Sequence, residues 1–231
     1  RVLDRNENIL ALDLPVKDIR VDPVVVLSNG QARVISQVLA RTLDLPYKQV
    51  YDRVNRPGRR DEPIMRFATE EVADRVARLK MPGVFFRSQT MRFYPHTTLA
   101  CHVLGFSNME GVGSAGIEQR LDSYLKGRSG FRESLRDGKR HELPDRRKIV
   151  IAAEEGADVH LTLDMNVQYY LEKALDAAMT NFNPEAAWAI VQDVRTGFIL
   201  GMASRPAYDL NIFNETGPDI RLNRAIGVNY E

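Results

Sequence analysis

The chain has 231 residues, of which 44% are hydrophobic and 27% charged, so it contains enough apolar material for one large or two smaller domains. Its 32 Lys and Arg balance 31 Asp and Glu, and a net charge of +1 argues against a dedicated nucleic-acid-binding protein. With 15 Gly and 11 Pro, the composition is typical of neither a fibrous nor a disordered chain. No run of 18 apolar residues occurs, so the sequence predicts no membrane-spanning helix.

The first half of the chain is predicted to mix hairpins and helices. Residues 1–26 have the pattern of a β-hairpin, because Arg5-Asn6-Glu7-Asn8 is turn chemistry between apolar flanks. Apolar residues at helical spacing predict a helix over 32–43, with Val34, Ile35, Val38, Leu39 and Leu43 on its buried face. Further predictions are a helix over 69–80 capped by Thr69, a strand over 84–95, a short helix over 97–104 and a helix over 115–126.

The second half repeats this mixture. The segment 128–148 is charged and carries a hairpin turn signal, Asp137-Gly138, so we expect a solvated ribbon or linker. A short strand is predicted over 159–163, and a hairpin over 187–203 turns at Thr196-Gly197. Asp164 is expected to cap a strong amphipathic helix, while the last 25 residues are expected to form a loop. The buried face of that helix is predicted to comprise Val167, Leu171, Ala174, Leu175, Ala178 and Phe182.

Side chains that could hold a metal or a phosphate are few. The only cysteine, Cys101, lies in an apolar run and is interpreted as a small core residue, so no disulfide or thiol cluster is available. The four histidines (His96, His102, His141 and His160) lack metal-ligand spacing and are interpreted as structural or exposed. The glycine-rich segment 111–116 lacks the lysine of a phosphate-binding loop and is interpreted as a turn that approaches other backbone closely.

Ser123-Tyr124-Leu125-Lys126 matches S-x-x-K, the nucleophile motif of penicillin-interacting enzymes. The apolar positions of the predicted helix put Ser123 and Lys126 on its opposite, solvent-facing side. These apolar positions are Ile117, Leu121, Tyr124 and Leu125. No Ser-x-Asn follows, and no Lys-Thr-Gly occurs anywhere in the chain. We therefore interpret the match as coincidental and expect Ser123 to be exposed and remote from any deep pocket.

The basic stretch Arg128–Lys148 has the charge to bind a polyanion and is densest at Arg146-Arg147-Lys148. Acidic residues interrupt the stretch, so a solvated face is the preferred interpretation. The interrupting residues are Glu133, Asp137, Glu142 and Asp145.

Short motifs follow one another in a defined order along the first part of the chain. They are Val2-Leu3-Asp4-Arg5-Asn6 with Leu10-Ala11, Arg92-x-Tyr94-Pro95, His102-Val103-Leu104-Gly105-Phe106, Gly113-x-x-Gly116-Ile117-Glu118 and Leu125-Lys126-Gly127-x-x-Gly130. In this order they resemble the segment after the membrane anchor and the pedestal domain of class B penicillin-binding proteins.

The second part of the chain continues the resemblance. Its motifs are Gly156-Ala157-Asp158-Val159-x-Leu161-Thr162-Leu163-Asp164, Asp193-Val194-x-Thr196-Gly197, Ser204-x-Pro206-x-Tyr208-Asp209-x-Asn211 and Leu222-Asn223-Arg224-Ala225. They are similar to the start of that family's transpeptidase domain. In the family the pattern then leads to Y-E-P-G-S-T-x-K, and this chain ends at Tyr230-Glu231, so we expect the nucleophile to lie beyond it. The endings at 222–225 and 230–231 favour the division-type enzymes over the elongation type.

The resemblance implies an α+β fold in two parts. Residues 1–150 would form a hairpin-rich pedestal, or dimerisation, domain, and residues 151–231 would open an α/β-sandwich transpeptidase domain that is incomplete here. It also implies a protein on the periplasmic side of the inner membrane, held by an N-terminal anchor absent from this chain. A membrane glycosyltransferase of cell-wall synthesis would be a partner, and no nucleic acid is expected to bind.

Activity would belong to the complete protein, which the resemblance describes as cross-linking peptidoglycan stem peptides by serine acyl transfer and as binding β-lactams. For this chain no catalytic, cofactor-binding or metal-ligating residue is predicted. Two alternatives stay open: a degenerate, non-catalytic scaffold of the wall-synthesis complex, and an unrelated enzyme that uses Ser123.

Overall fold

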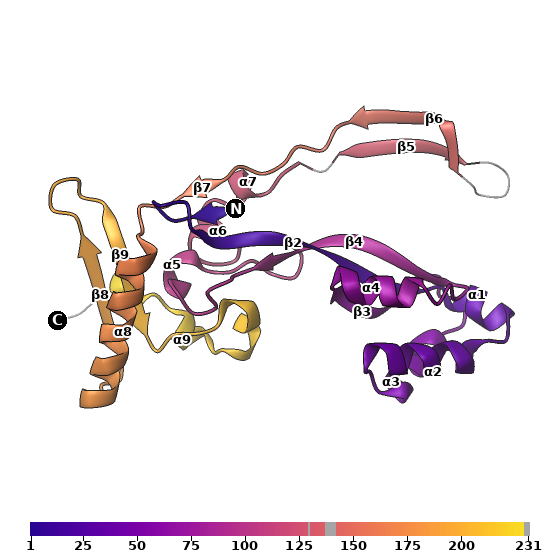
Figure 1. Cartoon of the computed structure of the whole chain (residues 1–231), viewed down its shortest axis with the longest axis horizontal. Helices are drawn as coiled ribbons and strands as arrows, with labels where there is room; N and C mark the ends of the chain where they lie inside the picture. Colours follow the sequence, from indigo (N-terminus) through magenta and orange to yellow (C-terminus); the bar gives the residue numbers. More distant parts are fainter. Residues whose placement is uncertain (129, 137–141, 229–231) are drawn as a thin grey trace. The chain divides into compact units, whose positions relative to one another are not determined.

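The computed structural model describes residues 1–128, 130–136 and 142–228, with side chains for all of these except 132–136 and 142–150. It confirms the predicted α+β class, since helices are mixed with strands that pair mainly antiparallel (Figure 1). The chain divides into two compact units, which are described separately: unit 2 is residues 13–91, and unit 1 is the remainder, 1–12 with 92 onward.

Unit 2 packs helices onto antiparallel strands. Strand β2 (Ile9–Val21) enters it and pairs with β3 (Glu62–Ala68) and β4 (Val84–Phe93). The helices are α1 (Pro23–Ser28), α2 (Ala32–Leu43), α3 (Tyr47–Val54) and α4 (Glu70–Ala77). The core is built from strand residues such as Ile19 and Val21 and helix residues such as Leu39 and Val50, all fully buried.

Helix α2 has the predicted bounds, and Ile35, Leu39 and Leu43 are buried as expected. Val34 was wrongly placed on the buried face, because its side chain is 63% exposed. The helix ends where Asp44 adopts the left-handed conformation, with φ of 52° and ψ of 44°.

Other elements of unit 2 differ from the predictions. The hairpin predicted to reach residue 26 ends at Val21, because Asp22 accepts the Val25 N–H at 3.2 Å and Pro23 opens helix α1. Thr69 caps α4 as predicted, but this helix ends at Ala77 rather than Lys80. Helix α3 and strand β3 were not predicted at all.

In unit 1 the first residues of the chain meet its second half. Strand β1 (Val2–Leu3) pairs antiparallel with the start of β2 and parallel with β7 (Val159–His160). Helix α8 (Met165–Phe182) lies against the hairpin of β8 (Ala187–Gln192) and β9 (Ile199–Arg205), as Figure 1 shows. Smaller helical segments are α5 (Cys101–Leu104), α6 (Gly116–Arg120), α7 (Asp122–Leu125), η1 (Leu210–Glu215), α9 (Pro218–Arg221) and α10 (Arg224–Gly227).

The ribbon predicted over 128–148 is present as backbone pairing between β5 (Phe131–Arg136) and β6 (Glu142–Ile151). Its turn signal Asp137-Gly138, its histidine His141 and the side chains of its basic cluster lie outside the described residues. The solvated face expected for this segment therefore stays a prediction.

Three predictions in unit 1 need correction. The helix predicted over 115–126 is interrupted at Leu121, and Tyr124, assigned to its apolar face, is 65% exposed. Helix α8 begins after Asp164 and buries Leu175 as expected, but its other buried residues are Gln168 and Glu172, and Phe182 is 80% exposed. The predicted C-terminal loop contains η1, α9 and α10 instead.

Candidate functional site

The glycine-rich turn lies where two stretches of backbone approach closely, as the sequence predicts. A Cβ on Gly113 would lie 2.1 Å from the carbonyl oxygen of Glu118, and one on Gly116 would lie 2.6 Å from that of Val103. Opposite them, a Cβ on Gly105 would lie 2.0 Å from the carbonyl oxygen of Ala115. Only glycine fits these three positions without a shift of the backbone, so the segment is the closely packed turn that the sequence predicts.

This turn positions Glu118 against Arg92. The Arg92 Nε donates to the Glu118 Oε1 at 2.8 Å, and both side chains are at least nine-tenths buried. The pair therefore joins the Arg92-x-Tyr94-Pro95 motif to the end of the Gly113-x-x-Gly116-Ile117-Glu118 motif. Charges this deeply buried persist because each satisfies the other, so neither is available to a substrate.

The Asp4 carboxylate, fully buried, organises the first turn of the chain. It accepts the backbone N–H of Asn6 at 2.7 Å and of Asn8 at 2.8 Å, and also the N–H of Met165 at 3.0 Å. Burial alone would raise the pKa of Asp4, but these hydrogen bonds outweigh it and lower the pKa. Since Asn6 Nδ2 also donates to Asp164 at 3.0 Å, the N-terminal turn is fixed to the start of α8.

Tyr94 and His102 are also bonded to the C-terminal segments. The Tyr94 N–H donates to Asn211 Oδ1 at 3.0 Å, and Asn211 Nδ2 donates back to the Tyr94 carbonyl at 3.0 Å. His102 Nε2 lies 2.8 Å from the Ile220 carbonyl, and burial lowers its pKa, which favours the neutral ring. His102 is thus structural, as predicted.

Cys101 is a core residue, as predicted, and is 2% exposed. Its carbonyl accepts the Tyr208 hydroxyl at 3.1 Å. Burial raises the pKa of the thiol to about 12, so the thiolate is scarcely populated at neutral pH.

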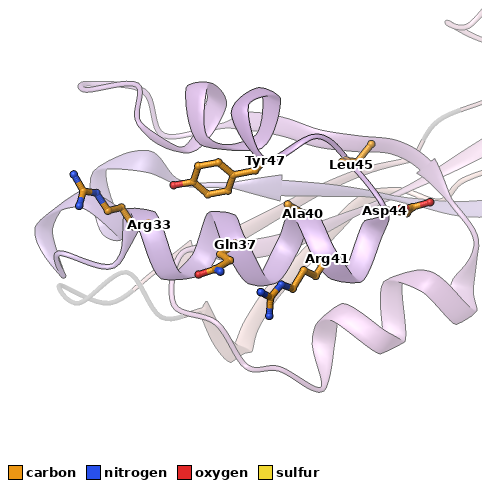
Figure 2. Close-up of a pocket in the computed structure, with 7 residues that line it drawn as sticks. All are labelled: Arg33, Gln37, Ala40, Arg41, Asp44, Leu45 and Tyr47. Atoms are coloured by element: carbon orange, nitrogen blue, oxygen red, sulfur yellow. The ribbon is translucent and has the colours of Figure 1, made fainter.

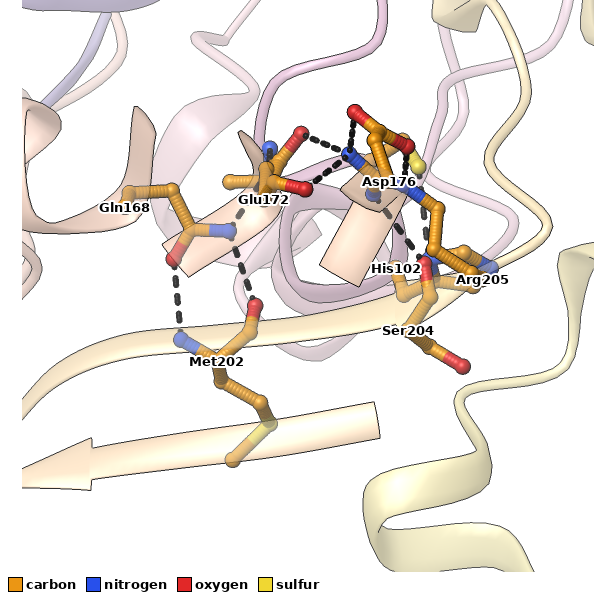
Figure 3. A network of polar contacts seen from close by, with 9 residues as sticks. His102, Gln168, Glu172, Asp176, Met202, Ser204 and Arg205 are labelled. Atoms are coloured by element: carbon orange, nitrogen blue, oxygen red, sulfur yellow. Dashed lines mark hydrogen bonds and ion pairs between the residues drawn. The ribbon is translucent and has the colours of Figure 1, made fainter. Parts of the chain in front are cut away.

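Glu172 is the centre of a buried polar network on α8 (Figure 3). Its Oε1 accepts the Ala100 N–H and Gln168 Nε2, both at 2.7 Å, and its Oε2 lies 3.2 Å from Arg205 NH2. Arg205 also binds Asp176, whose pKa this contact lowers. A cavity of about 430 Å³ opens on the outer side of the network, beside His96 and Tyr169.

Ser123 is exposed, as predicted, on the four-residue helix α7. Lys126 follows the helix with an extended ψ of 112°, and neither side chain lines the cavity beside His96. An exposed hydroxyl without a bonded base is a weak nucleophile, so the geometry does not support acyl transfer at Ser123. His96 and His160 are exposed.

Unit 2 carries a surface groove that the sequence analysis did not identify. It has a volume of about 620 Å³ and lies along α2 and the start of α3. Figure 2 shows Arg33, Gln37 and Arg41 spaced along α2, with Tyr47 beside them. The four-residue spacing of these three polar residues was the available signal, since it puts them on one helix face. The lining residues are Arg33, Gln37, Ala40, Arg41, Asp44, Leu45 and Tyr47.

Among the described residues, no helix combines the length and the apolar character needed to cross a membrane, and no group of three or more His, Cys, Asp and Glu is arranged to hold a metal ion. The buried side chains of Asp4, Glu118 and Glu172 instead bind other side chains and the backbone of unit 1. Their arrangement forms a fixed junction between the N-terminal turn, the segment 92–118 and helix α8.

Comparisons with known proteins agree with this arrangement. Residues 1–161 match the family described as the penicillin-binding protein dimerisation domain. The chain is 34% identical over 235 residues to the probable peptidoglycan D,D-transpeptidase FtsI of Caulobacter vibrioides, covering 100% of this chain and 34% of that protein. It is 30% identical to peptidoglycan D,D-transpeptidase FtsI of Escherichia coli K12, covering 97% of this chain and 38% of the relative.

Among solved structures, that of the complex between penicillin-binding protein PBP2 and MreC from Helicobacter pylori has a similar fold. The TM-score is 0.72 at 19% identity, over 98% of this chain and 46% of that one. The chain thus spans little more than a third of the length of the curated relatives it matches. The family match covers most of the chain, and the ordered motifs meet in one junction. This chain therefore belongs to the penicillin-binding protein dimerisation domain family and, with it, to the class B penicillin-binding proteins.

Proposed function

We propose that this chain is a non-catalytic pedestal: it supports the transpeptidase domain of a class B penicillin-binding protein and binds other proteins of cell-wall synthesis. The complete protein would cross-link peptidoglycan stem peptides through a serine that lies outside residues 1–231. It would act on the extracytoplasmic side of the membrane, held by an anchor that precedes this segment.

One observation carries this proposal: three ionisable residues of the family-like motifs are buried and bonded within unit 1. Asp4, Arg92 and Glu118 are each directed into unit 1, where they bind backbone or an opposite charge. A catalytic carboxylate or base must instead reach a substrate in a cleft. These residues therefore serve as fixed connections, which is what a pedestal requires.

We further propose that residues 1–150 are the pedestal domain and that 151–231 open the transpeptidase domain. The family match ends at residue 161, close to this boundary. Helix α8 and the hairpin β8–β9 follow it and leave apolar side chains exposed, among them Ile190 at 45% and Phe198 at 51%. A following domain would cover such a surface.

The partners belong to the same proposal. The Helicobacter pylori relative of similar fold was solved with MreC, and we propose that this pedestal likewise binds proteins of the wall-synthesis assembly, including a membrane glycosyltransferase. The motif Leu222-Asn223-Arg224-Ala225 of this chain, together with two relatives named FtsI, favours a division-type assembly.

Labelling with a fluorescent penicillin tests the proposal. The 231-residue chain should remain unlabelled, and the gene product extended to the end of a transpeptidase domain should be labelled on a serine beyond residue 231. Ser123→Ala in the extended protein should leave labelling unchanged. Stoichiometric labelling of the 231-residue chain would overturn the pedestal proposal, and an unlabelled extended protein would favour the degenerate scaffold.

A further inference from the structure

The groove on unit 2 contains two guanidinium groups without partners. Arg33 and Arg41 are exposed on one face of α2, and neither makes an ion pair or hydrogen bond within the described residues. Several other cations of unit 2 are paired, for example Lys17 with Glu70 and Arg87 with Asp61, whereas Arg33 and Arg41 share one groove. Two unpaired arginines in one groove are therefore available to bind an anionic partner.

Charge is unevenly distributed along the chain. Unit 2 contains 14 Lys and Arg against 10 Asp and Glu, a net charge of +4, whereas the rest of the sequence contains 18 against 21, a net charge of −3. The groove thus belongs to the positively charged unit. Such a unit attracts acidic partners over distances of about a Debye length, roughly 8 Å at physiological salt.

The geometry of the groove limits what can bind there. Arg33 and Arg41 are eight residues apart on a helix, which separates their Cα atoms by about 12 Å. An extended peptide covers that distance in about four residues, so carboxylates at such a spacing would reach both guanidinium groups. The groove is also lined by Ala40, Leu45 and Tyr47, and Tyr47 stacks on Tyr51 at 5.6 Å between ring centroids.

Asp44 distinguishes between two classes of anionic partner. It is exposed in the same groove and would repel the uniform negative charge of an anionic lipid surface. A peptide, in contrast, has backbone N–H groups that can donate to the Asp44 carboxylate while its acidic side chains meet the arginines. The mixture of charges and the concave shape therefore favour a peptide.

We propose that this groove binds an extended acidic segment of a partner protein, with two carboxylates about four residues apart and an apolar or aromatic side chain between them. This inference rests on the proposed function, because it names the kind of partner that the pedestal holds. Arg33 and Arg41 would fix the carboxylates, and Tyr47 would contact the intervening side chain.

Selection from a random library of displayed peptides, about 12 residues long, tests the inference with the immobilised 231-residue chain. Selected peptides should be enriched in Asp and Glu at the stated spacing. Their affinity should fall roughly tenfold or more for Arg33→Glu/Arg41→Glu and should weaken as NaCl is raised. Arg33→Gln/Arg41→Gln, which removes charge without reversing it, should give a smaller loss, and circular dichroism should show both variants folded.

The matched control is Arg60→Glu/Arg78→Glu, which changes the charge of unit 2 equally at two exposed residues outside the groove. Peptide binding should survive this change. The inference is overturned if the selected peptides lack acidic residues, or if the Arg60→Glu/Arg78→Glu control weakens binding as much as Arg33→Glu/Arg41→Glu. It is also overturned if the chain instead binds phosphatidylglycerol vesicles through Arg33 and Arg41. Penicillin labelling of the extended protein does not involve the groove, so a failure here leaves the pedestal proposal to its own test.

Discussion

Removal of the Glu172 carboxylate should destabilise unit 1 severely. In Glu172→Ala the buried Ala100 N–H loses its acceptor, and Arg205 loses one of its two anionic partners. An unsatisfied buried donor costs about 1–3 kcal/mol, and breaking a buried ion pair costs about 3–5 kcal/mol. Arg205 retains Asp176, so the two terms together should lower the free energy of unfolding by about 3–5 kcal/mol rather than their full sum.

Two further variants separate the parts of this estimate. Glu172→Gln keeps an oxygen that can accept the Ala100 N–H but removes the charge that faces Arg205, so we expect a loss of about 1–3 kcal/mol. Lys173→Ala, at an exposed neighbour on the same helix, should change the free energy by less than about 0.5 kcal/mol.

Urea denaturation followed by tryptophan fluorescence measures these differences. Trp188 is the only tryptophan of the chain and lies on β8, so its emission reports unit 1 and not unit 2. The midpoint should shift while the dependence on urea concentration stays constant. The reasoning is refuted if Glu172→Ala is no more destabilising than Lys173→Ala, or if Glu172→Gln is as destabilising as Glu172→Ala.

Three other predictions concern unit 1. Gly105→Ala should lower the free energy of unfolding by about 3 kcal/mol or more, because its Cβ would meet the Ala115 carbonyl. Gly111 also has a positive φ but has open space around it, so Gly111→Ala should cost about 1 kcal/mol in the same urea assay. Equal losses for the two variants would contradict the crowding at Gly105. The lowered pKa of Asp4 stabilises the fold above the unfolded-state value near 4, and this contribution is lost as pH falls through the folded-state pKa. The stability difference between the native chain and Asp4→Asn should therefore shrink below about pH 4, and a difference independent of pH would refute the assignment. Cys101 should react with Ellman's reagent only after unfolding; rapid reaction of the native chain would show that the thiol is not buried.

The sequence predicts elements whose signals are local, and helices α2 and α8 are the clearest cases. Both have apolar residues at helical spacing. Asp44 ends α2, and Asp164 begins α8. Strand β3 was missed because it carries Pro63 and a buried Glu62, which do not match an apolar alternation. Glu62 is accommodated there by an ion pair with Arg56.

Errors in the predicted helices of unit 1 have a common physical cause, which is pairing between residues that lie apart in the sequence. The helix expected over 115–126 is interrupted beside Asp122, whose carboxylate accepts the Gly113 N–H at 2.7 Å. Likewise, Gln168 and Glu172 are buried on α8 because Met202, Ala100 and Arg205 supply their partners. A periodic pattern of apolar residues cannot show these bonds, although the ordered motifs did indicate which segments belong to one family.

Unit 1 is built from two separate stretches of the chain, and this has a consequence for folding during synthesis. Unit 2 is a contiguous stretch, residues 13–91, whereas unit 1 needs residues on both sides of it. Val2 and Leu3 pair with Val159 and His160, so strand β1 has no partner in β7 until the ribosome has added more than 150 further residues. Unit 2 can complete its own core first, and it then shortens the free chain that must close before β1 and β7 meet, which lowers the entropy cost of that closure. The inserted unit thus aids the pairing of the two chain segments that flank it in the sequence.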